Sequence, residues 1–204
     1  MIGLEKLIIV AILGYFFGSF NFAIIISKFH KGKDVRELGS GNAGGTNMLR
    51  NFGLKWGIIT VLCDGLKCVI SIFTARAIMP GNILAEMIAA TFCIAGHCYP
   101  IFFKFKGGKG VAVTATMLAV VDWRLFIISA IVFFVIAGIS QYASLASMTA
   151  AVVNAIASIF VRSGDYVFIT WCFGIALFII FLHRDNIKRL INKTENKLTF
   201  KRKR

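Results

Sequence analysis

Three short polar segments of this chain carry residue types that can bind a phosphate group and position it for chemistry. The first segment, residues 37–50, reads ELGSGNAGGTNMLR. Its four glycines allow the backbone to approach a ligand closely and to point N–H groups inward. Arg50 adds a planar fork that suits a phosphate. The neutral hydrogen-bonding side chains of the segment are Ser40, Asn42, Thr46 and Asn47. We therefore expect a ligand-binding loop here rather than a plain connector.

The second segment, residues 96–111, reads GHCYPIFFKFKGGKGV, and an apolar run follows it. Its glycine-rich part consists of Gly107, Gly108, Lys109 and Gly110. Backbone N–H groups and a helix N-terminus at one spot would form an anion-binding site. The pattern GxxxxGK[ST] is absent, which argues against a nucleotide. His97, shortly before the glycines, is either an ordinary helix-end histidine or a residue of the site.

The third segment, residues 183–195, reads HRDNIKRLINKTE. His183 and Asn186 are three residues apart, so they would share one face of a helix. Asp64 and Lys67 have the same spacing within an apolar run, where each charge can neutralise the other. We expect a buried structural pair, with a place beside the site as the alternative.

A turn at residues 140–147 carries three serines. These serines, Ser147 among them, are either plain helix N-caps or polar groups of the site, and we place Ser147 in the phosphate-binding set. The five cysteines lie in apolar stretches without metal-ligand spacing, and no acidic or histidine cluster suggests a metal. We expect neither a metal nor a cofactor.

The elements that position these segments are membrane spans. The chain has 204 residues, of which 58% are hydrophobic, and a net charge of +14 that is confined to short clusters. Apolar runs of about the 20 residues that a spanning helix needs lie near 4–27, 56–79, 82–103, 111–140, 143–161 and 166–182. The fourth run contains Asp122-Trp123-Arg124. A charge in mid-bilayer costs roughly 2.5–3.5 kcal/mol, so we expect a turn there between helices at 111–121 and 125–140.

Basic clusters follow the first, third and last runs, and the positive-inside rule places all of them in the cytoplasm. Seven helices satisfy this rule and six do not. The sequence thus predicts an all-α, polytopic membrane protein with its N-terminus outside, its C-terminus cytoplasmic and one domain, 1–204. The basic tail at 197–204 would anchor to the lipid surface. Because the Lys and Arg residues lie beside spans, membrane lipid and anionic substrates are expected partners, and nucleic acid is not.

The strings GSGNAGGTNMLR, GHCYPIFFKFKGGKGVAVTATM and HRDNIKRLINKTE, in this order, closely resemble the bacterial acyl-phosphate:glycerol-3-phosphate acyltransferases. The resemblance runs nearly the whole length and includes DGLK at 64–67 and YASLAS at 142–147. It implies transfer of a fatty acyl group from acyl phosphate to the sn-1 hydroxyl of glycerol 3-phosphate, which gives 1-acylglycerol 3-phosphate. It also implies a bacterial cell membrane location with a cytoplasmic active site, no cofactor, and the enzyme that makes acyl phosphate as a partner.

The resemblance assigns roles to individual residues. It makes Ser40, His183 and Asn186 catalytic, makes Arg50 and the loop from Gly107 to Gly110 phosphate-binding, and makes Glu195 structural. The chain departs from the family pattern in three places: Gly45 replaces the usual alanine, Asp185 replaces the usual glutamate, and neither Gly nor Pro flanks Thr194-Glu195.

Acyl phosphate is a mixed anhydride with a good leaving group, so no covalent acyl-enzyme is needed. Direct attack by the substrate hydroxyl is preferred to a Ser40 nucleophile. The proton can go to His183 or to a substrate phosphate oxygen. Two rival classes remain, a transporter or anion channel, and a different lipid acyl- or phosphotransferase. The clustering of polar residues at one membrane face, without paired interrupted helices, disfavours a transporter.

Overall fold

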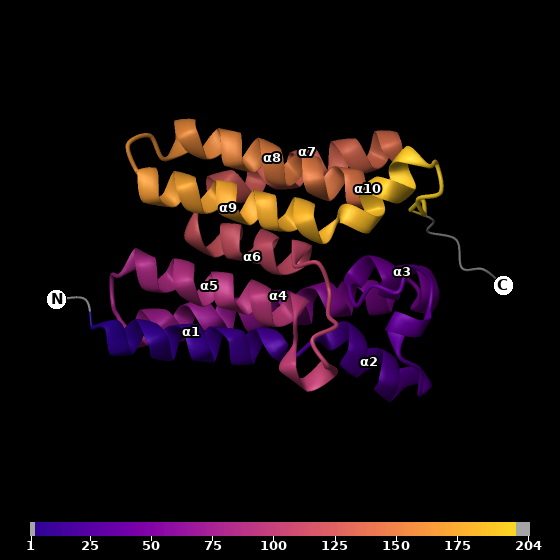
Figure 1. Cartoon of the computed structure of the whole chain (residues 1–204), viewed down its shortest axis with the longest axis horizontal. Coiled ribbons are helices and arrows are strands. Elements are labelled where there is room, and N and C mark those ends of the chain that lie inside the picture. Colours follow the sequence, from indigo (N-terminus) through magenta and orange to yellow (C-terminus); the bar gives the residue numbers. More distant parts are fainter. Residues whose placement is uncertain (1–2, 199–204) are drawn as a thin grey trace. The chain divides into compact units, whose positions relative to one another are not determined.

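The computed structural model of the chain describes residues 3–198 and is all-helical within that range (Figure 1). The prediction of an all-α fold is therefore confirmed. In chain order the helices are α1 (Leu4–Ser19), α2 (Phe22–Lys31), the short 3-10 helix η1 (Val35–Glu37), α3 (Gly45–Phe52), α4 (Leu54–Ile78), α5 (Ile83–Cys98), the 3-10 helix η2 (Ile101–Phe103), α6 (Val111–Val121), α7 (Trp123–Ser140), α8 (Ala143–Val161), α9 (Tyr166–Leu182) and α10 (Arg184–Ile191). From residue 199 onward, the basic tail predicted at 197–204 lies outside the described part.

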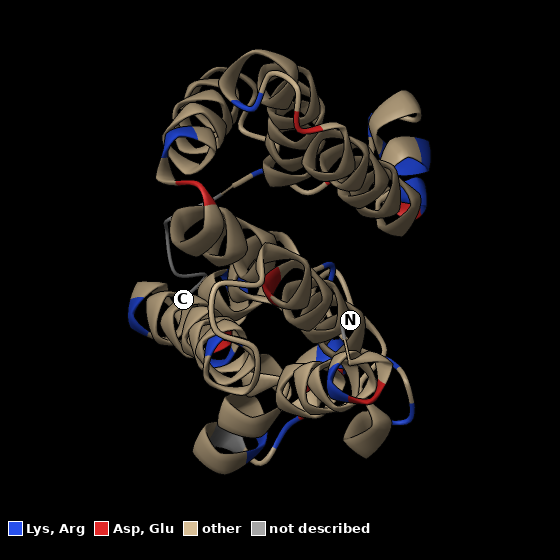
Figure 2. Cartoon of the chain, turned by 90° about the vertical axis from the view of Figure 1, so that its left-hand side faces the viewer, with Lys and Arg blue, Asp and Glu red and all other residues tan. Residues whose placement is uncertain are grey.

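Several helices are long and apolar enough to cross a membrane. Within the described residues these are Leu4–His30, Leu54–Ile78, Ile83–Phe103, Trp123–Ser140 and Ala143–Val161, and the pair α9 and α10, bent by 58°, is a sixth if taken as one span. Helix α6 has 11 residues and is about 16 Å long, about half of the hydrocarbon thickness. The chain is thus a multi-pass membrane protein. Figure 2 shows that charged residues occupy only a small part of the ribbon, as such a protein requires. Seven spans and the orientation of the termini stay predictions.

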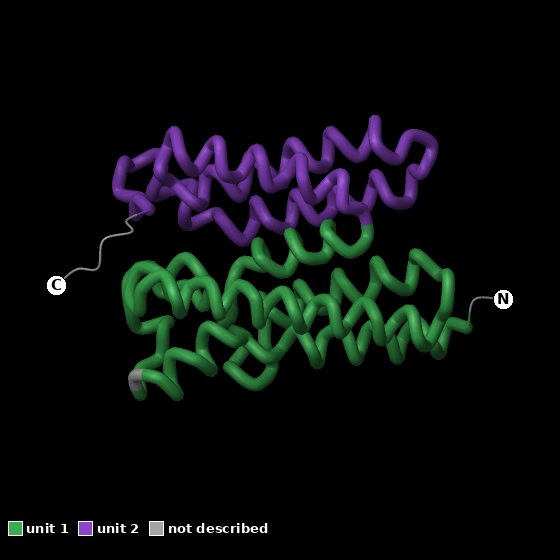
Figure 3. Tube along the Cα trace, turned by 180° about the vertical axis from the view of Figure 1, so that it is seen from behind, with its two compact units in different colours: residues 1–121, 200–204 green, residues 122–199 purple. Residues whose placement is uncertain are grey.

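The chain divides into two compact units (Figure 3). Unit 1 runs up to Val121 and contains α1 to α6, and unit 2 begins at Asp122 and contains α7 to α10. The first and second polar segments belong to unit 1, and the third belongs to unit 2.

Glycines bring α1 and α5 of unit 1 into close contact. Gly14 and Gly18 are four residues apart on α1, and a Cβ atom at Gly14 would come within 2.6 Å of the Ala89 carbonyl oxygen on α5. A Cβ at Gly18 would collide with the Cys93 carbonyl, and one at Gly96 of α5 would collide with backbone of α1. Small residues at this spacing let the backbones of membrane helices pack closely.

The first apolar run, predicted as one helix over 4–27, is broken at Phe20-Asn21. Asn21 lies at the start of α2, where its side-chain oxygen accepts a hydrogen bond from the Ile24 N–H (3.2 Å). An asparagine is a favoured N-cap, so a polar residue inside the apolar run starts a second helix.

The predicted turn at residues 122–124 is present in unit 2. Asp122 accepts a hydrogen bond from the Arg124 N–H (3.2 Å) and forms ion pairs with Arg124 (2.8 Å) and Arg162 (2.7 Å). Because Asp122 caps the helix, α7 starts at Trp123, two residues earlier than expected. Farther along, the Asn154 amide of α8 donates to Ser129 of α7 (2.8 Å).

Candidate active site

Asn47 organises the first loop. Its side-chain nitrogen donates to three loop carbonyls, those of Val35 (3.0 Å), Leu38 (2.9 Å) and Asn42 (3.0 Å). Its side-chain oxygen accepts from the Ser40 N–H (3.1 Å) and from the Asn51 amide (2.9 Å). The sequence suggests a phosphate contact for Asn47, but both ends of its amide are occupied by the loop itself. The geometry favours a role in shaping the loop.

The other residues expected to bind substrate in this segment surround the start of α3. Ser40 and Asn42 lie in the loop before the helix, Thr46 is its second residue, and Arg50 lies in its last turn. Gly45, the departure from the family pattern, begins the helix. A Cβ there would collide with Val61 of α4, so the valine occupies the space that an alanine at position 45 would need.

The glycine loop of the second segment packs back onto the end of α5. The Gly107 N–H donates to the Cys98 carbonyl (3.0 Å), and the Gly108 N–H donates to the His97 carbonyl (3.1 Å). The expectation that these two N–H groups point at a ligand is therefore wrong, because the unpaired carbonyls at the C-terminus of a helix take them. The N-terminus of α6, which follows Lys109 and Gly110, stays as the candidate anion site of this segment.

Arg36 joins the first loop to the second. Its guanidinium donates to the carbonyls of Phe103 (2.9 Å) and Lys106 (2.9 Å) and forms an ion pair with Asp34 (2.7 Å). The turn that it holds contains Lys104 and Phe105, both with φ of 57°, a left-handed conformation that costs energy in a residue other than glycine. The hydrogen bond from Arg36 lowers the pKa of Asp34 from 3.8 to about 2.

The sequence does not reveal this Asp34–Arg36 clamp, because a carboxylate two residues before an arginine has no specific pattern. Nor does the sequence single out Asn21, whose amide donates to the Ala43 carbonyl of the first loop (3.3 Å) and to the His97 carbonyl (3.4 Å). The polar residue in the middle of an apolar run was the available signal. Within unit 1, the structure thus brings the first and second segments together.

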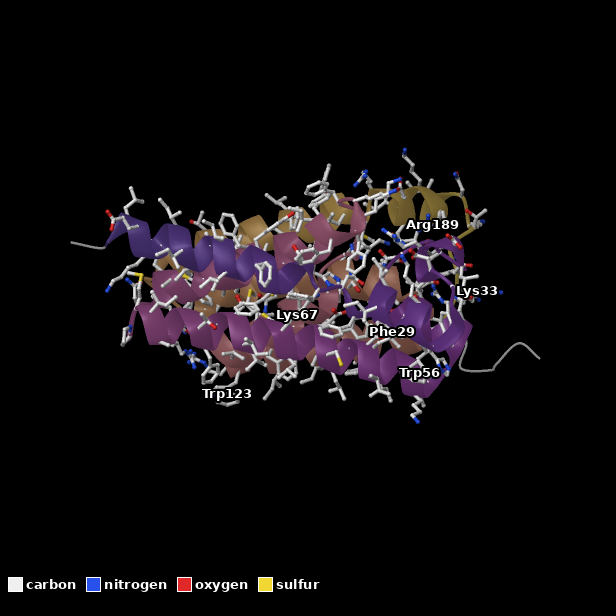
Figure 4. All side chains as sticks on the ribbon, turned by 90° about the horizontal axis from the view of Figure 1, so that it is seen from below. Phe29, Lys33, Trp56, Lys67, Trp123 and Arg189 are labelled. Atoms are coloured by element: carbon white, nitrogen blue, oxygen red, sulfur yellow. The ribbon has the colours of Figure 1, made fainter. Side chains whose placement is uncertain are left out.

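The predicted pair of Asp64 and Lys67 is present on α4 with a separation of 2.9 Å, and both side chains are buried. Figure 4 shows Lys67 midway along unit 1, whereas Phe29, Lys33 and Trp56 lie toward one end. The Lys67 Nζ atom also lies 3.0 Å from His97 Nδ1. His97 therefore has charged partners, which neither of its two interpretations specified.

In unit 2, the carboxylate of Glu195 gathers the third segment. It accepts hydrogen bonds from Arg189 (2.7 Å), Asn186 (2.8 Å) and Ser144 (3.0 Å). Burial acts to raise the pKa of Glu195, but these hydrogen bonds outweigh it and the net pKa lies below its ordinary value. The carboxylate ties α10 to the start of α8, an arrangement that fits a structural role.

His183 lies at the junction of α9 and α10, where it ends one helix and begins the other. Its Nδ1 atom is 2.8 Å from the Ile179 carbonyl oxygen. A carbonyl only accepts hydrogen bonds, so Nδ1 carries a proton, and in a neutral ring Nε2 is then the basic nitrogen. His183 is thus the C-cap of α9, and Asn186 lies inside α10. The helix predicted to carry both residues on one face is therefore present, but it is bent at His183.

Ser144 and Ser147 lie inside α8, and Tyr142 is its N-cap residue. The interpretation of these two serines as N-caps is therefore wrong. The Ser147 hydroxyl donates to the Ala143 carbonyl (2.7 Å), which leaves its oxygen lone pairs as acceptors.

Sequence comparisons point to one family. A model for a family described as glycerol-3-phosphate acyltransferase matches residues 8–193. Glycerol-3-phosphate acyltransferase 2 of Bacillus cereus is 43% identical over 192 residues, which cover 94% of this chain and 95% of the relative. The glycerol-3-phosphate acyltransferase of Thermosipho melanesiensis is 43% identical over 186 residues, which cover 91% of this chain and 89% of that relative.

Two solved structures have a similar fold. Both are of PlsY, described as an integral membrane glycerol 3-phosphate acyltransferase. The glycerol 3-phosphate form has a TM-score of 0.87 and 33% identity, and the lysophosphatidic acid form has a TM-score of 0.84 and 31% identity. Each comparison covers 95% of this chain and 96% of the other.

Proposed function

Because the chain belongs to the glycerol-3-phosphate acyltransferase family, we propose that it takes a fatty acyl group from acyl phosphate and transfers it to the sn-1 hydroxyl of glycerol 3-phosphate. The product is 1-acylglycerol 3-phosphate. The proposal places the active site at the cytoplasmic face of a bacterial cell membrane, with the enzyme that makes acyl phosphate as a partner. Membership in an enzyme family decides against the transporter and anion-channel alternative.

One observation carries the proposal. Arg36 and Asn21 hold the first polar loop against the second segment. Arg36 donates to carbonyls of the turn just before the glycine loop, and Asn21 donates to one carbonyl of the first loop and to the carbonyl of His97. Both substrates carry a phosphate, and anionic groups repel each other when they are brought together. A site for this reaction needs cationic groups and aimed N–H groups at one place. The two joined loops supply Arg50, Lys109 and the N-terminus of α6 for that task.

The chemistry is acyl transfer by direct attack. The substrate hydroxyl oxygen bonds to the carbonyl carbon of the acyl phosphate, the bond from that carbon to the phosphate oxygen breaks, and phosphate leaves. The hydroxyl proton goes either to Nε2 of His183 or to a phosphate oxygen. A hydroxyl such as that of Ser40 would then stabilise charge through a hydrogen bond and would not itself become acylated.

In unit 2, Asn186 and Ser147 are the polar side chains that the proposal assigns to the reaction beside His183. Asn186 is hydrogen-bonded to Glu195 (2.8 Å), which fixes the orientation of its amide. Ser147 offers a hydroxyl on the same helix as Ser144. We propose that Asn186 and Ser147 take part in the acyl transfer.

A donor assay tests the proposal. Purified protein in detergent is given glycerol 3-phosphate together with acyl phosphate, acyl-CoA or acyl carrier protein carrying the same chain, each separately. We expect lysophosphatidic acid only with acyl phosphate. Equal or faster product formation from acyl-CoA or from acyl carrier protein would instead support a different lipid acyltransferase.

A further inference from the structure

The side-chain nitrogen of Lys67 is surrounded by oxygen acceptors in the interior of unit 1. It lies 2.7 Å from the Phe20 carbonyl, 2.9 Å from the Gly18 carbonyl and 2.9 Å from Oδ1 of Asp64. Carbonyl and carboxylate oxygens only accept hydrogen bonds, so three such neighbours require three N–H donors. Lys67 is therefore an ammonium ion, and it holds the break between α1 and α2.

The fourth neighbour of this ammonium is Nδ1 of His97, at 3.0 Å. An ammonium has no lone pair and cannot accept a hydrogen bond. An Nδ1–H aimed at the cation would be repelled, so Nδ1 presents its lone pair and shares one N–H of the ammonium with Oδ1 of Asp64. A neutral His97 then carries its proton on Nε2. The carboxylate of Asp64 is farther from Nδ1, at 3.5 Å.

The Nε2 side of the His97 ring faces the glycine loop. A Cβ atom at Gly108 would collide with Nε2 and would come within 2.5 Å of the Ala43 carbonyl oxygen in the first loop. The Gly108 N–H also donates to the carbonyl of His97 itself (3.1 Å). Glycine is required at position 108 because the imidazole of His97 fills the space that a side chain there would need.

We infer that His97 is a further binding residue, whose Nε2–H donates to a substrate phosphate held at the glycine loop, and that Lys67 and Asp64 are positioning residues that fix this tautomer. The inference rests on the proposed function, since that function places a phosphate at this loop. An N–H donor in surroundings of low dielectric constant strengthens the binding of an anion. It also supplies a donor where the N–H groups of Gly107 and Gly108 are occupied.

The tautomer can be tested without any activity measurement. Three histidines are present in the chain, so nitrogen-15 labelled histidine gives a spectrum that can be assigned by comparison with His97→Gln. Near neutral pH, we expect the His97 signals to show a protonated Nε2 and an unprotonated Nδ1. A proton on Nδ1, or on both nitrogens, would overturn the inference.

Kinetics then test the donor. The amide nitrogen of glutamine in His97→Gln can reach the position of Nε2, whereas that of asparagine in His97→Asn reaches only the position of Nδ1. We expect KM for one of the two phosphate substrates to stay within about threefold of wild type in His97→Gln and to rise about tenfold or more in His97→Asn. The rise should exceed any change in kcat. His30→Gln, at an exposed histidine, is the control.

Equal KM values in His97→Asn and wild type would contradict a specific Nε2–H donor. An equal rise in KM in His97→Gln and His97→Asn would contradict it as well. A wild-type protein that does not use acyl phosphate would count against the proposed function instead. The labelled-histidine spectrum of that same protein would still decide the tautomer.

Discussion

Arg50 lies in the last turn of α3, at the end of the helix that the first loop begins. Its guanidinium can contact two phosphate oxygens at once, and no other residue type offers that planar fork. In the proposed reaction its task is to bind glycerol 3-phosphate rather than to transfer a proton.

We therefore expect Arg50→Ala to raise KM for glycerol 3-phosphate by about tenfold to a hundredfold, the loss that follows removal of a charge-assisted hydrogen bond. Arg50→Lys keeps the charge without the fork, so its KM should lie between those of wild type and Arg50→Ala. Steady-state kinetics with glycerol 3-phosphate as the varied substrate measures both. Unchanged KM and kcat in Arg50→Ala would remove Arg50 from the site.

At the same scale, Asn47 and His97 show how a residue's task depends on neighbours distant in sequence. The polarity of Asn47 suggested a ligand contact, yet its amide is consumed by five groups of its own loop and helix. His97 was open to an ordinary interpretation, yet it lies against Lys67. Residue type alone could not distinguish these outcomes.

At the scale of the helices, the close packing of α1 against α5 depends on glycine. The Cβ of an alanine at Gly18 would collide with the Cys93 carbonyl, and backbone cannot move aside as a flexible side chain can. Overpacking of this kind costs about 1–3 kcal/mol.

We expect Gly18→Ala to lower the melting temperature in detergent by several degrees. Gly138→Ala on α7 is the matched control, because nothing lies within 4 Å of a Cβ atom there. Alanine also favours the helix over glycine, so the control should be neutral or slightly stabilised. Equal melting temperatures for the two variants would contradict the close packing of α1 on α5.

The Asp34–Arg36 clamp gives the loops of unit 1 a pH dependence. The pKa of Asp34 is about 2 in the folded protein and ordinarily 3.8. A lowered carboxylate pKa stabilises the folded state above the ordinary value, and this contribution is lost as the pH falls from 3.8 towards 2. The clamp should therefore be fully formed at neutral pH.

The corresponding measurement compares thermal unfolding of wild type and Asp34→Asn between pH 5 and about pH 2. Wild type should melt higher at pH 5, and the difference should shrink as Asp34 becomes protonated. Glu5→Gln, at an exposed carboxylate, corrects for the general effect of acid. A difference that stays constant across this range would show that Asp34 is not ion-paired.

On the scale of the whole molecule, the proposal requires the loops of unit 1 and the third segment of unit 2 to face the cytoplasm. Lys33 and Lys193 are exposed residues of these regions. Trp123 is also exposed and lies at the opposite end of unit 2 from Arg189 (Figure 4).

We expect Lys33→Cys and Lys193→Cys to react with a membrane-impermeant thiol reagent only from the cytoplasmic side, in a background without the five native cysteines. Trp123→Cys should react only from outside. Labelling of Lys33→Cys and Lys193→Cys from opposite sides would contradict the predicted topology.

The sequence by itself determined the membrane class, the all-helical fold, the turn at Asp122 and the family. These follow from local properties, namely the length of apolar runs, the cost of charge in lipid and three contiguous motifs. It also predicted the Asp64–Lys67 pair, since residues three apart on one helix must lie close together.

Only the tertiary structure decided the break at Asn21, the clamp by Arg36, the occupied N–H groups of Gly107 and Gly108, and the partners of His97. Each depends on groups that are separated in the chain and meet only after folding. A hydrogen bond made to one partner is no longer available to a ligand. The same loop residues can therefore be binding groups or supports, and only the location of their partners in space distinguishes the two.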